Sequence, residues 1–150
     1  MAQSTREGAQ LGRITAIIPI CDEGPSTIAA IKSAFDQTYP DVEVLVVQWS
    51  SFKLKAALPV DFLHPRIRII SVEAATKYTA LNTALTAATG DLLTYLDPGN
   101  HWSPDFLSMM ADTCRHADCA WGTVRLKYGQ STLGSIRMGH GAAVATQALT

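Results

Sequence analysis

The sequence predicts an α/β fold in which a mainly parallel sheet is flanked by helices. Short runs that read as strands alternate with segments whose apolar residues recur at helical spacing. Several strand-like runs are predominantly apolar, which is typical of strands that helices cover on both faces. Glycine and proline turn signals separate the segments, and 150 residues are enough for one domain with its own core.

Two strands and a helix are expected in the first third of the chain. Residues 14–19 (ITAIIP) and 42–47 (VEVLVV) read as buried strands because they are rich in β-branched residues. Between them, Pro25 suits the first turn of a helix. The inner face of that helix is predicted to carry Ile28, Ile31 and Phe35.

The middle of the chain continues this alternation. Residues 51–58 are predicted to form a short helix that Pro59 ends, and residues 66–70 (RIRII) a strand with one wetter face. A second long helix is predicted over residues 78–88, with Gly90 as its stop signal. Its inner face is predicted to carry Leu81, Ala84, Leu85 and Ala88.

The last third becomes less regular along its length. Residues 92–96 (LLTYL) are predicted as a fourth strand, and Ser103-Pro104 as the start of a helix that ends near residue 117. The inner face of this helix is predicted to comprise Phe106, Met109, Met110 and Thr113. Residues 120–126 read as a fifth strand, whereas residues 129–150 lack periodicity and are expected to form a loop or an edge element.

Composition sets the broad class of the protein. A polar, flexible tail is expected over residues 1–12, a folded domain over residues 13–128 and an irregular segment over residues 129–150. With 47% apolar and 17% charged residues, the chain reads as an ordinary soluble domain without a transmembrane segment. A net charge of -1 gives no basic patch for nucleic acid. Three cysteines do not form an even disulfide framework, so a reducing cytoplasmic location is expected.

One carboxylate stands where an α/β domain usually binds its ligand. Asp97 follows the strand predicted over residues 92–96 and precedes a Pro98-Gly99 turn and Asn100. Ligands of open α/β sheets bind at the carboxyl ends of the strands, where a carboxylate can hold a metal ion or a sugar hydroxyl. The alternative is structural, because Asp before Pro-Gly is also a common turn signal.

Four segments together resemble a known family. They are residues 17–23 (IIPICDE), 35–47 (FDQTYPDVEVLVV), 80–91 (ALNTALTAATGD) and 95–97 (YLD). In this order they resemble the opening strand and loop, the Gln-Thr-Tyr-Pro segment, the Asn-containing helix and the metal-binding Asp-x-Asp position of family 2 glycosyltransferases. The resemblance runs from about residue 14 to about residue 121.

The resemblance implies a single GT-A domain, which has a Rossmann-like sheet and holds a nucleotide-sugar at the carboxyl ends of its strands. Such enzymes transfer a sugar from a UDP- or GDP-linked donor to a hydroxyl acceptor by direct displacement. A divalent metal, Mg²⁺ or Mn²⁺, neutralises the departing diphosphate. The positions that this implies for the nucleotide-sugar are Asp22, Glu23, Gln48, Trp49 and Asn82. Those that it implies for the metal are Asp97 and Asn100.

The chain departs from the family pattern at its acidic positions. After the second strand the family has Asp-Asp-Gly-Ser, whereas this chain has Gln48-Trp49 followed by two serines. Gly99 stands in place of the second acid of Asp-x-Asp, which leaves Asn100 to offer a neutral oxygen. No Asp or Glu follows Asp118, so the family's carboxylate base has no counterpart and the catalytic residues are unknown. Either residues 129–150 are a truncated acceptor half, or the chain does not work in the usual way.

Other interpretations stay open. The chain could be an inactive pseudo-glycosyltransferase that serves as a binding or assembly module, or an unrelated nucleotide-binding α/β domain, and it could form a homo-oligomer. Asp22 and Glu23 could only bond the helix that follows them. Trp49 could pack in the core, and Asn82 could face solvent. Lys77 could contact a phosphate, but an exposed lysine is the better default.

Overall fold

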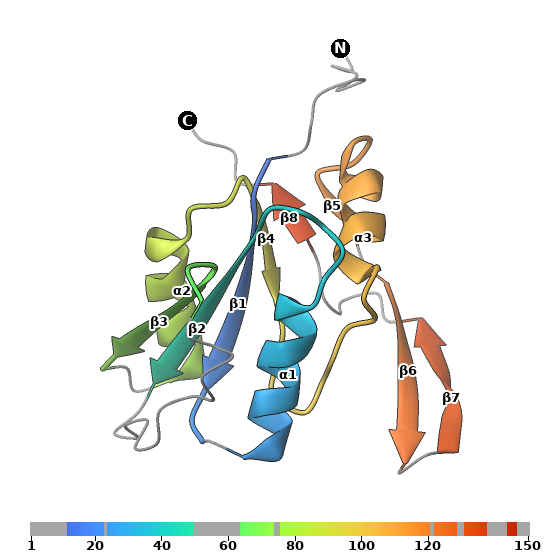
Figure 1. The fold of residues 1–150 in the computed structure, drawn as a ribbon, viewed down its shortest axis with the longest axis horizontal. Coiled ribbons are helices and arrows are strands. Elements are labelled where there is room, and N and C mark those ends of the chain that lie inside the picture. The colour runs from blue at the N-terminus through green and yellow to red at the C-terminus, as the bar shows by residue number, and fades with distance from the viewer. Residues whose placement is uncertain are drawn as a thin grey trace.

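The computed structural model describes residues 12–22, 24–49, 64–73, 76–120, 122–128, 131–137 and 144–146 (Figure 1). From residue 123 onward the description covers backbone and strand pairing. The tail predicted over residues 1–12, except for Gly12, lies outside the described residues. So do the helix predicted over residues 51–58 and Glu23.

A six-stranded sheet forms the centre of the fold, with the order β3-β2-β1-β4-β8-β5. Its strands are β1 (Ile14–Ile20), β2 (Val42–Trp49), β3 (Ile67–Val72), β4 (Leu92–Tyr95), β5 (Cys119–Ala120) and β8 (Val144–Thr146). The first four pair in parallel, while β8 runs antiparallel to both β4 and β5. The predicted mainly parallel sheet is therefore confirmed.

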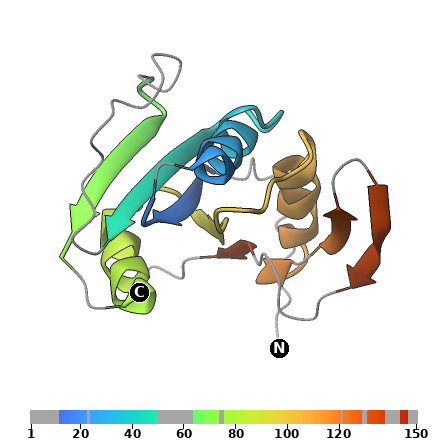
Figure 2. The ribbon, with the colours of Figure 1, turned by 90° about the horizontal axis from the view of Figure 1, so that it is seen from below.

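Three helices cover the two faces of this sheet. They are α1 (Pro25–Phe35), α2 (Lys77–Ala87) and α3 (Phe106–Cys114). Figure 2 shows α1 and α3 on one face and α2 on the other. Helices α1 and α2 agree with prediction to within one or two residues, and Pro25 is the first residue of α1 as expected. The inner face of α1 is made mainly by Thr27, Ala30, Ile31 and Ala34, with Ile28 and Phe35 partly buried.

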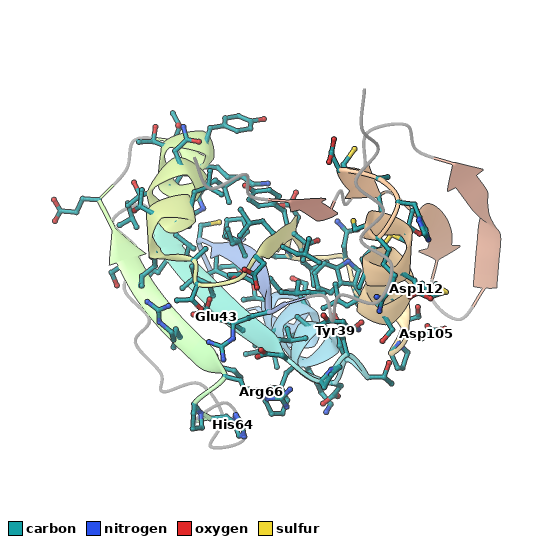
Figure 3. All side chains as sticks on the ribbon, turned by 90° about the horizontal axis from the view of Figure 1, so that it is seen from above. Tyr39, Glu43, His64, Arg66, Asp105 and Asp112 are labelled. Atoms are coloured by element: carbon teal, nitrogen blue, oxygen red, sulfur yellow. The ribbon has the colours of Figure 1, made fainter. Side chains whose placement is uncertain are left out.

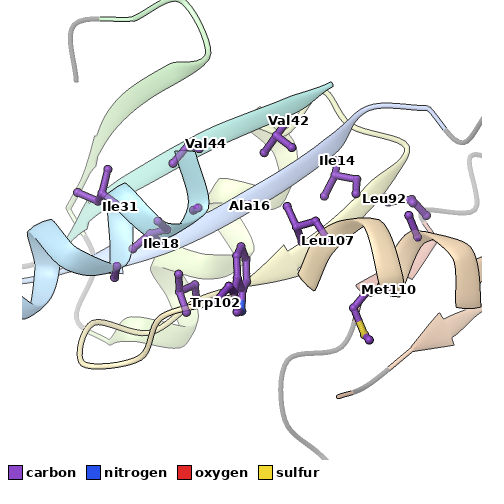
Figure 4. Close-up of a cluster of buried hydrophobic side chains, with 14 of the residues drawn as sticks. Ile14, Ala16, Ile18, Ile31, Val42, Val44, Leu92, Trp102, Leu107 and Met110 are labelled. Atoms are coloured by element: carbon purple, nitrogen blue, oxygen red, sulfur yellow. The ribbon is translucent and has the colours of Figure 1, made fainter. Parts of the chain in front are cut away.

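The core is split by the sheet into two apolar layers. Along β1, the side chains of Ile14, Ala16 and Ile18 pack towards α1 and α3 (Figure 4). Ile17 points the other way and packs with Ala80 and Ala84 of α2. All seven residues of β1 are buried. Burial on both faces explains why the strands read as apolar runs without polar alternation.

The predicted inner face of α3 is wrong, because the helix buries residues mostly one position further along the chain. It buries Leu107, Met110, Ala111 and Cys114, while Met109 is 50% exposed. Both sets have helical spacing, so periodicity alone does not choose between them. In the tertiary structure Leu107 is fully buried, whereas Phe106 is partly buried and stacks on Trp102 at a ring distance of 5.1 Å. The helix also begins two residues after Pro104 and ends at Cys114, earlier than predicted.

The C-terminal third contains more strand than predicted. The single strand expected over residues 120–126 is two strands, β5 and β6 (Thr123–Tyr128), which belong to different sheets. The segment expected to be irregular contains β7 (Ser131–Arg137), which forms an antiparallel hairpin with β6, and also β8. Strand β8 lies between β4 and β5, not at an edge (Figure 1).

The Gln-Thr-Tyr-Pro segment after α1 anchors the chain that leads into α3. Gln37 is 7% exposed, and its Nε2 donates to the carbonyl oxygens of Ser33 (2.9 Å) and Ser103 (2.8 Å). Its Oε1 accepts from the backbone N–H of Leu107 (2.9 Å). This bond satisfies a backbone donor in the first turn of α3, where no side chain of the flanking residue caps the helix. The backbone N–H of Thr38 donates to Pro104 O (2.8 Å), so the motif fixes how α3 approaches α1.

A buried carboxylate ties the amino-terminal ends of β1, β2 and β4 together. Glu43 of β2 accepts hydrogen bonds from the hydroxyl of Thr15 (2.7 Å) and from both the N–H (3.0 Å) and the hydroxyl (2.9 Å) of Thr89. Arg68 pairs with the other carboxylate oxygen, and Figure 3 labels Glu43 among the side chains of the sheet. Burial raises the pKa of Glu43, but these hydrogen bonds outweigh burial and hold the pKa below its usual value. The Ala-Thr-Gly-Asp motif therefore serves the fold, at the edge opposite the strands' carboxyl ends.

Candidate functional site

The strand order makes the carboxyl ends of β1 and β4 a topological switch point, where a ligand crevice is expected. These neighbouring strands are parallel, yet the chain leaves β1 towards β2 on one side and reaches β4 on the other. Ligands of open α/β sheets bind at such a switch point, outside the carboxyl ends of the strands. Asp22 follows β1 and Asp97 follows β4. Two of the predicted site residues therefore flank the expected crevice.

Asp22 is exposed and turned towards the start of α1. Its Oδ1 accepts from the backbone N–H of Gly24 (2.8 Å) and from the hydroxyl of Thr27 (2.9 Å). One carboxylate oxygen thus serves the first turn of the helix, which is the structural alternative considered for this residue. A ligand at Asp22 would have to use the other oxygen or share this one.

Gln48 and Trp49 end β2 beside the same edge. Gln48 is 6% exposed and lies between Ile20 of β1 and Ser71 of β3 in register. Trp49 is partly buried and packs against the apolar cluster on the α2 face of the sheet. The packing of Trp49 favours its structural interpretation over base stacking, whereas Gln48 is a buried polar group near the carboxyl end of β2.

Residues 97–100 form a tight turn at the end of β4. The backbone N–H of Leu96 donates to Ile17 O (3.0 Å), which extends the pairing with β1 up to the turn. The N–H of Asn100 then donates to Asp97 O (3.1 Å), and Gly99 has a φ of 92°. Proline at the second position and positive φ at the third are the features of a type II turn. Asp97 and Asn100 are both exposed at this turn.

The positive φ of Gly99 gives a direct prediction. No atom lies within 4 Å of the position where a Cβ would stand, so Gly99→Ala causes no clash. An L-residue at this φ is nevertheless strained, and we expect the variant to lose about 1 kcal/mol of unfolding free energy. Urea titration measures the loss. An unchanged midpoint would show that the turn relaxes into another geometry without cost.

Lys77, the first residue of α2, lies beside the Asp97 turn. Its Nζ pairs with Oδ1 of Asp97, and the side chains are 34% and 49% exposed. Sequence reasoning left Lys77 as an exposed lysine, and its pairing with Asp97 joins residues 20 positions apart in the chain. One signal was present: a lysine in the first turn opposes the helix dipole, so it needs a nearby anion or a function.

Asn82 is the predicted site residue that the structure does not bring to this edge. It is exposed in the second turn of α2, and helix geometry places it 200° from both Ala80 and Ala84, since successive residues turn by about 100°. Ala80 and Ala84 are the residues that α2 buries against the sheet. Asn82 therefore lies on the outward face, and this position favours its solvent-facing alternative.

The residues around Asp97 fit a divalent ion poorly. Mg²⁺ and Mn²⁺ prefer several oxygen ligands, and carboxylates bind them best. Here Asp97 Oδ1 faces an ammonium, Gly99 has no side chain, and Asn100 offers a neutral amide. Among the described residues, no three His, Cys, Asp or Glu side chains gather as candidate metal ligands. A metal at Asp97 and Asn100 therefore remains a prediction from the resemblance.

A hollow lies away from the predicted site residues. It is open, has a volume of about 380 Å³ and lies between α1 and the loop that precedes α3, where Lys32, Ser33, His101 and Trp102 line it. None of the predicted site residues contributes to it.

Within the described part of the chain, no helix is both long enough and apolar enough to cross a membrane.

Comparison with known proteins agrees with this architecture. Residues 15–144 match glycosyl transferase family 2. Mannosyltransferase PcManGT from Pyrobaculum calidifontis, solved in complex with GDP-Man and Mn²⁺, is 28% identical with a TM-score of 0.57, over 71% of this chain and 32% of that chain. S. aureus TarS 1–349 in complex with UDP-GlcNAc is 19% identical with a TM-score of 0.56, over 71% of this chain and 33% of its own, and supports the fold alone.

The chain spans about a third of the length of these two solved chains. A search of curated proteins gives no match. The family match nevertheless covers most of the sequence. It includes the four parallel strands β1 to β4, except for the first residue of β1. On this basis, the chain belongs to glycosyl transferase family 2.

Proposed function

We propose that this chain binds a nucleoside-diphosphate sugar at the carboxyl edge of its sheet and takes part in transferring the sugar to a hydroxyl acceptor. Family membership supports the reaction class. The observation that supports the proposal is that Asp22 and Asp97 follow the neighbouring parallel strands β1 and β4, and that Lys77 of α2 pairs with Asp97. UDP and GDP are the nucleotides to test, because the solved relatives were studied with GDP-Man and with UDP-GlcNAc.

Each residue at this edge has a chemical role available to it. Gln48 can bond the edge of a base through its amide, and the exposed carboxylates of Asp22 and Asp97 can accept from ribose or sugar hydroxyls. Lys77 adds one fixed positive charge beside them. This set can recognise a donor. We assign no base for the acceptor hydroxyl, because the sequence contains no Asp or Glu after Asp118.

A non-catalytic binding module is the second candidate. The observation that favours it is the Asp97 turn, which carries one carboxylate where the family has two. Both candidates predict that nucleotide-sugars bind. They differ in turnover, because only the transferase releases the nucleoside diphosphate when an acceptor or water attacks the bound sugar.

Thermal unfolding with ligands tests donor binding. UDP, GDP, UDP-GlcNAc or GDP-Man at about 100 times its dissociation constant is expected to stabilise the fold by about 2.7 kcal/mol, which is a rise in Tm of about 5–10 °C. Asp97→Ala is expected to reduce the rise for the nucleotide-sugars, because the variant removes an acceptor for sugar hydroxyls.

Asp112→Ala is the matched control. It also removes one aspartate, but this residue lies on the exposed face of α3 and pairs with Arg115. The control should keep the full ligand-induced rise in Tm. If none of the four ligands raises the Tm of the unmodified chain, with or without Mn²⁺, donor binding is excluded. A rise in Tm without release of UDP or GDP from the nucleotide-sugar in an acceptor screen would favour the binding module.

A further inference from the structure

The Lys77–Asp97 ion pair is the feature that stability does not explain. Both side chains are partly exposed, and exposed ion pairs contribute little to folding. Lys77 also stands at the first position of α2, where a positive charge opposes the helix dipole, and the first turn carries no acidic residue of its own. A side chain whose charge opposes the helix dipole is expected mainly at positions where function requires it.

The ion pair fixes a positive charge beside the carboxyl end of β4. Asp97 follows β4, and α2 packs through Ala80 and Ala84 on Ile17 of β1 and Leu45 of β2. The ammonium is therefore held on one side by a helix that rests on the central strands, and on the other by the carboxylate at the end of β4. A lysine held in this way loses less freedom when it binds an anion than a mobile surface lysine does.

The neighbouring turn disfavours a divalent ion, whereas the ammonium of Lys77 already lies beside it. The type II geometry needs Gly99 at a φ of 92°, a conformation that disfavours an aspartate in its place. One carboxylate and one amide make a weak site for a divalent ion, whereas an ammonium needs no further ligands from the protein to bind phosphate oxygens.

We infer that Lys77 binds the diphosphate of the donor and supplies the positive charge that the family takes from a divalent metal. This inference rests on the proposed function. Asp97 acts as a positioning residue that holds the ammonium through Oδ1, and the diphosphate oxygens approach the remaining N–H groups of Lys77 Nζ. Nucleoside diphosphates then bind this chain without a divalent ion.

Calorimetry with UDP and GDP in EDTA, and again with Mn²⁺, tests the inference. The unmodified chain is expected to bind one of the two nucleotides in EDTA, with an affinity that Mn²⁺ changes by less than about threefold. Lys77→Ala is expected to weaken binding in EDTA by about tenfold or more, since it removes a charge-assisted hydrogen bond, and Lys77→Arg is expected to restore most of it.

Lys32→Ala is the matched control. This lysine is also on a helix and also paired with an aspartate, Asp36, but it lies on α1 and lines the separate hollow. The control should bind nucleotide like the unmodified chain. Melting curves show whether each variant is folded, and because Lys77 is partly exposed its substitution is expected to leave the fold intact.

Three results overturn the inference, and they differ in what they leave standing. Binding that requires Mn²⁺, or Lys77→Ala binding that equals the unmodified chain in EDTA, rejects the role of Lys77 and leaves the proposed function in place. Absence of UDP and GDP binding in both conditions, together with no thermal shift by nucleotide-sugars, rejects both.

Discussion

Gly90→Ala is expected to lose about 3 kcal/mol of unfolding free energy. A Cβ on Gly90 would stand 2.6 Å from the backbone nitrogen of Thr15 and 2.8 Å from the carbonyl oxygen of Arg13. Both atoms belong to the backbone at the start of β1, the central strand of the parallel sheet, so neither can rotate away. The strand has to move, and overpacking of this kind typically costs about 1–3 kcal/mol, more where the backbone is rigid. The Cβ would also stand 2.7 Å from Thr15 Oγ1, the oxygen that accepts the hydrogen bond from Gly90 N–H (2.9 Å), so this bond is strained as well.

Urea titration of the purified chain measures this loss, with Gly99→Ala as the matched control. Both variants add one methyl group to a glycine, but Gly99 has open space around it and carries only the cost of its positive φ. The loss at Gly90 should therefore exceed that at Gly99 about threefold. Equal losses would show that β1 adjusts freely and that the close approach at Gly90 is not a constraint.

Glu43→Gln is expected to lose about 2–3 kcal/mol at pH 7. One oxygen of Glu43 accepts three hydrogen bonds from Thr15 and Thr89, and the other pairs with Arg68. A glutamine of the same shape replaces one oxygen by an N–H₂ group and removes the charge. A donor then faces donors in a site that is 5% exposed, and leaving such groups unsatisfied costs about 1–3 kcal/mol each.

The pH dependence of this loss follows from the low pKa of Glu43 in the folded chain. Its usual value is 4.5, and hydrogen bonds hold it lower in the fold despite burial. The stabilisation by the carboxylate is therefore complete above the unfolded-state value and is lost as the pH falls through the folded-state pKa. We expect the difference in unfolding free energy between the unmodified chain and Glu43→Gln to be constant from pH 7 to about 6 and to shrink below about 4.5.

Glu73→Gln is the control for this experiment. Glu73 is exposed just after β3, and the same substitution there should change the unfolding free energy by less than about 0.5 kcal/mol. If Glu43→Gln is equally neutral at pH 7, the hydrogen-bond network around Glu43 does not stabilise the fold. Because the network lies at the amino-terminal ends of the strands, folded Glu43→Gln should bind nucleotides like the unmodified chain.

Two of the motifs that resemble the family hold the fold together. Gln37 bonds the chain on either side of the α3 start, and Thr89 bonds the buried carboxylate of Glu43. Sequence reasoning used these residues to recognise a family but could not give them a structural task. The task depends on partners 66, 70 and 46 residues away in the chain, which no local pattern contains.

Dependence on partners distant in the chain also explains why the predictions for the C-terminal segment and for the buried face of α3 were wrong. A short strand such as β8, with three residues, carries too little sequence to signal that it pairs with both β4 and β5. In α3, Phe106 and Leu107 both begin an apolar stripe at helical spacing, and only the contacts with the sheet and with the loop before α3 show that Leu107 is buried while Phe106 stacks on Trp102.

The sequence by itself determined the described strands and helices from β1 to α3, the parallel core of the sheet and the family. It did so because apolar runs, helical periodicity and turn residues are local properties that each segment carries alone. The tertiary structure decided which helix face is buried, where β8 inserts, and that Lys77 meets Asp97 at the carboxyl edge. Those outcomes depend on contacts between segments distant in the chain, and such contacts exist only once the sheet has formed.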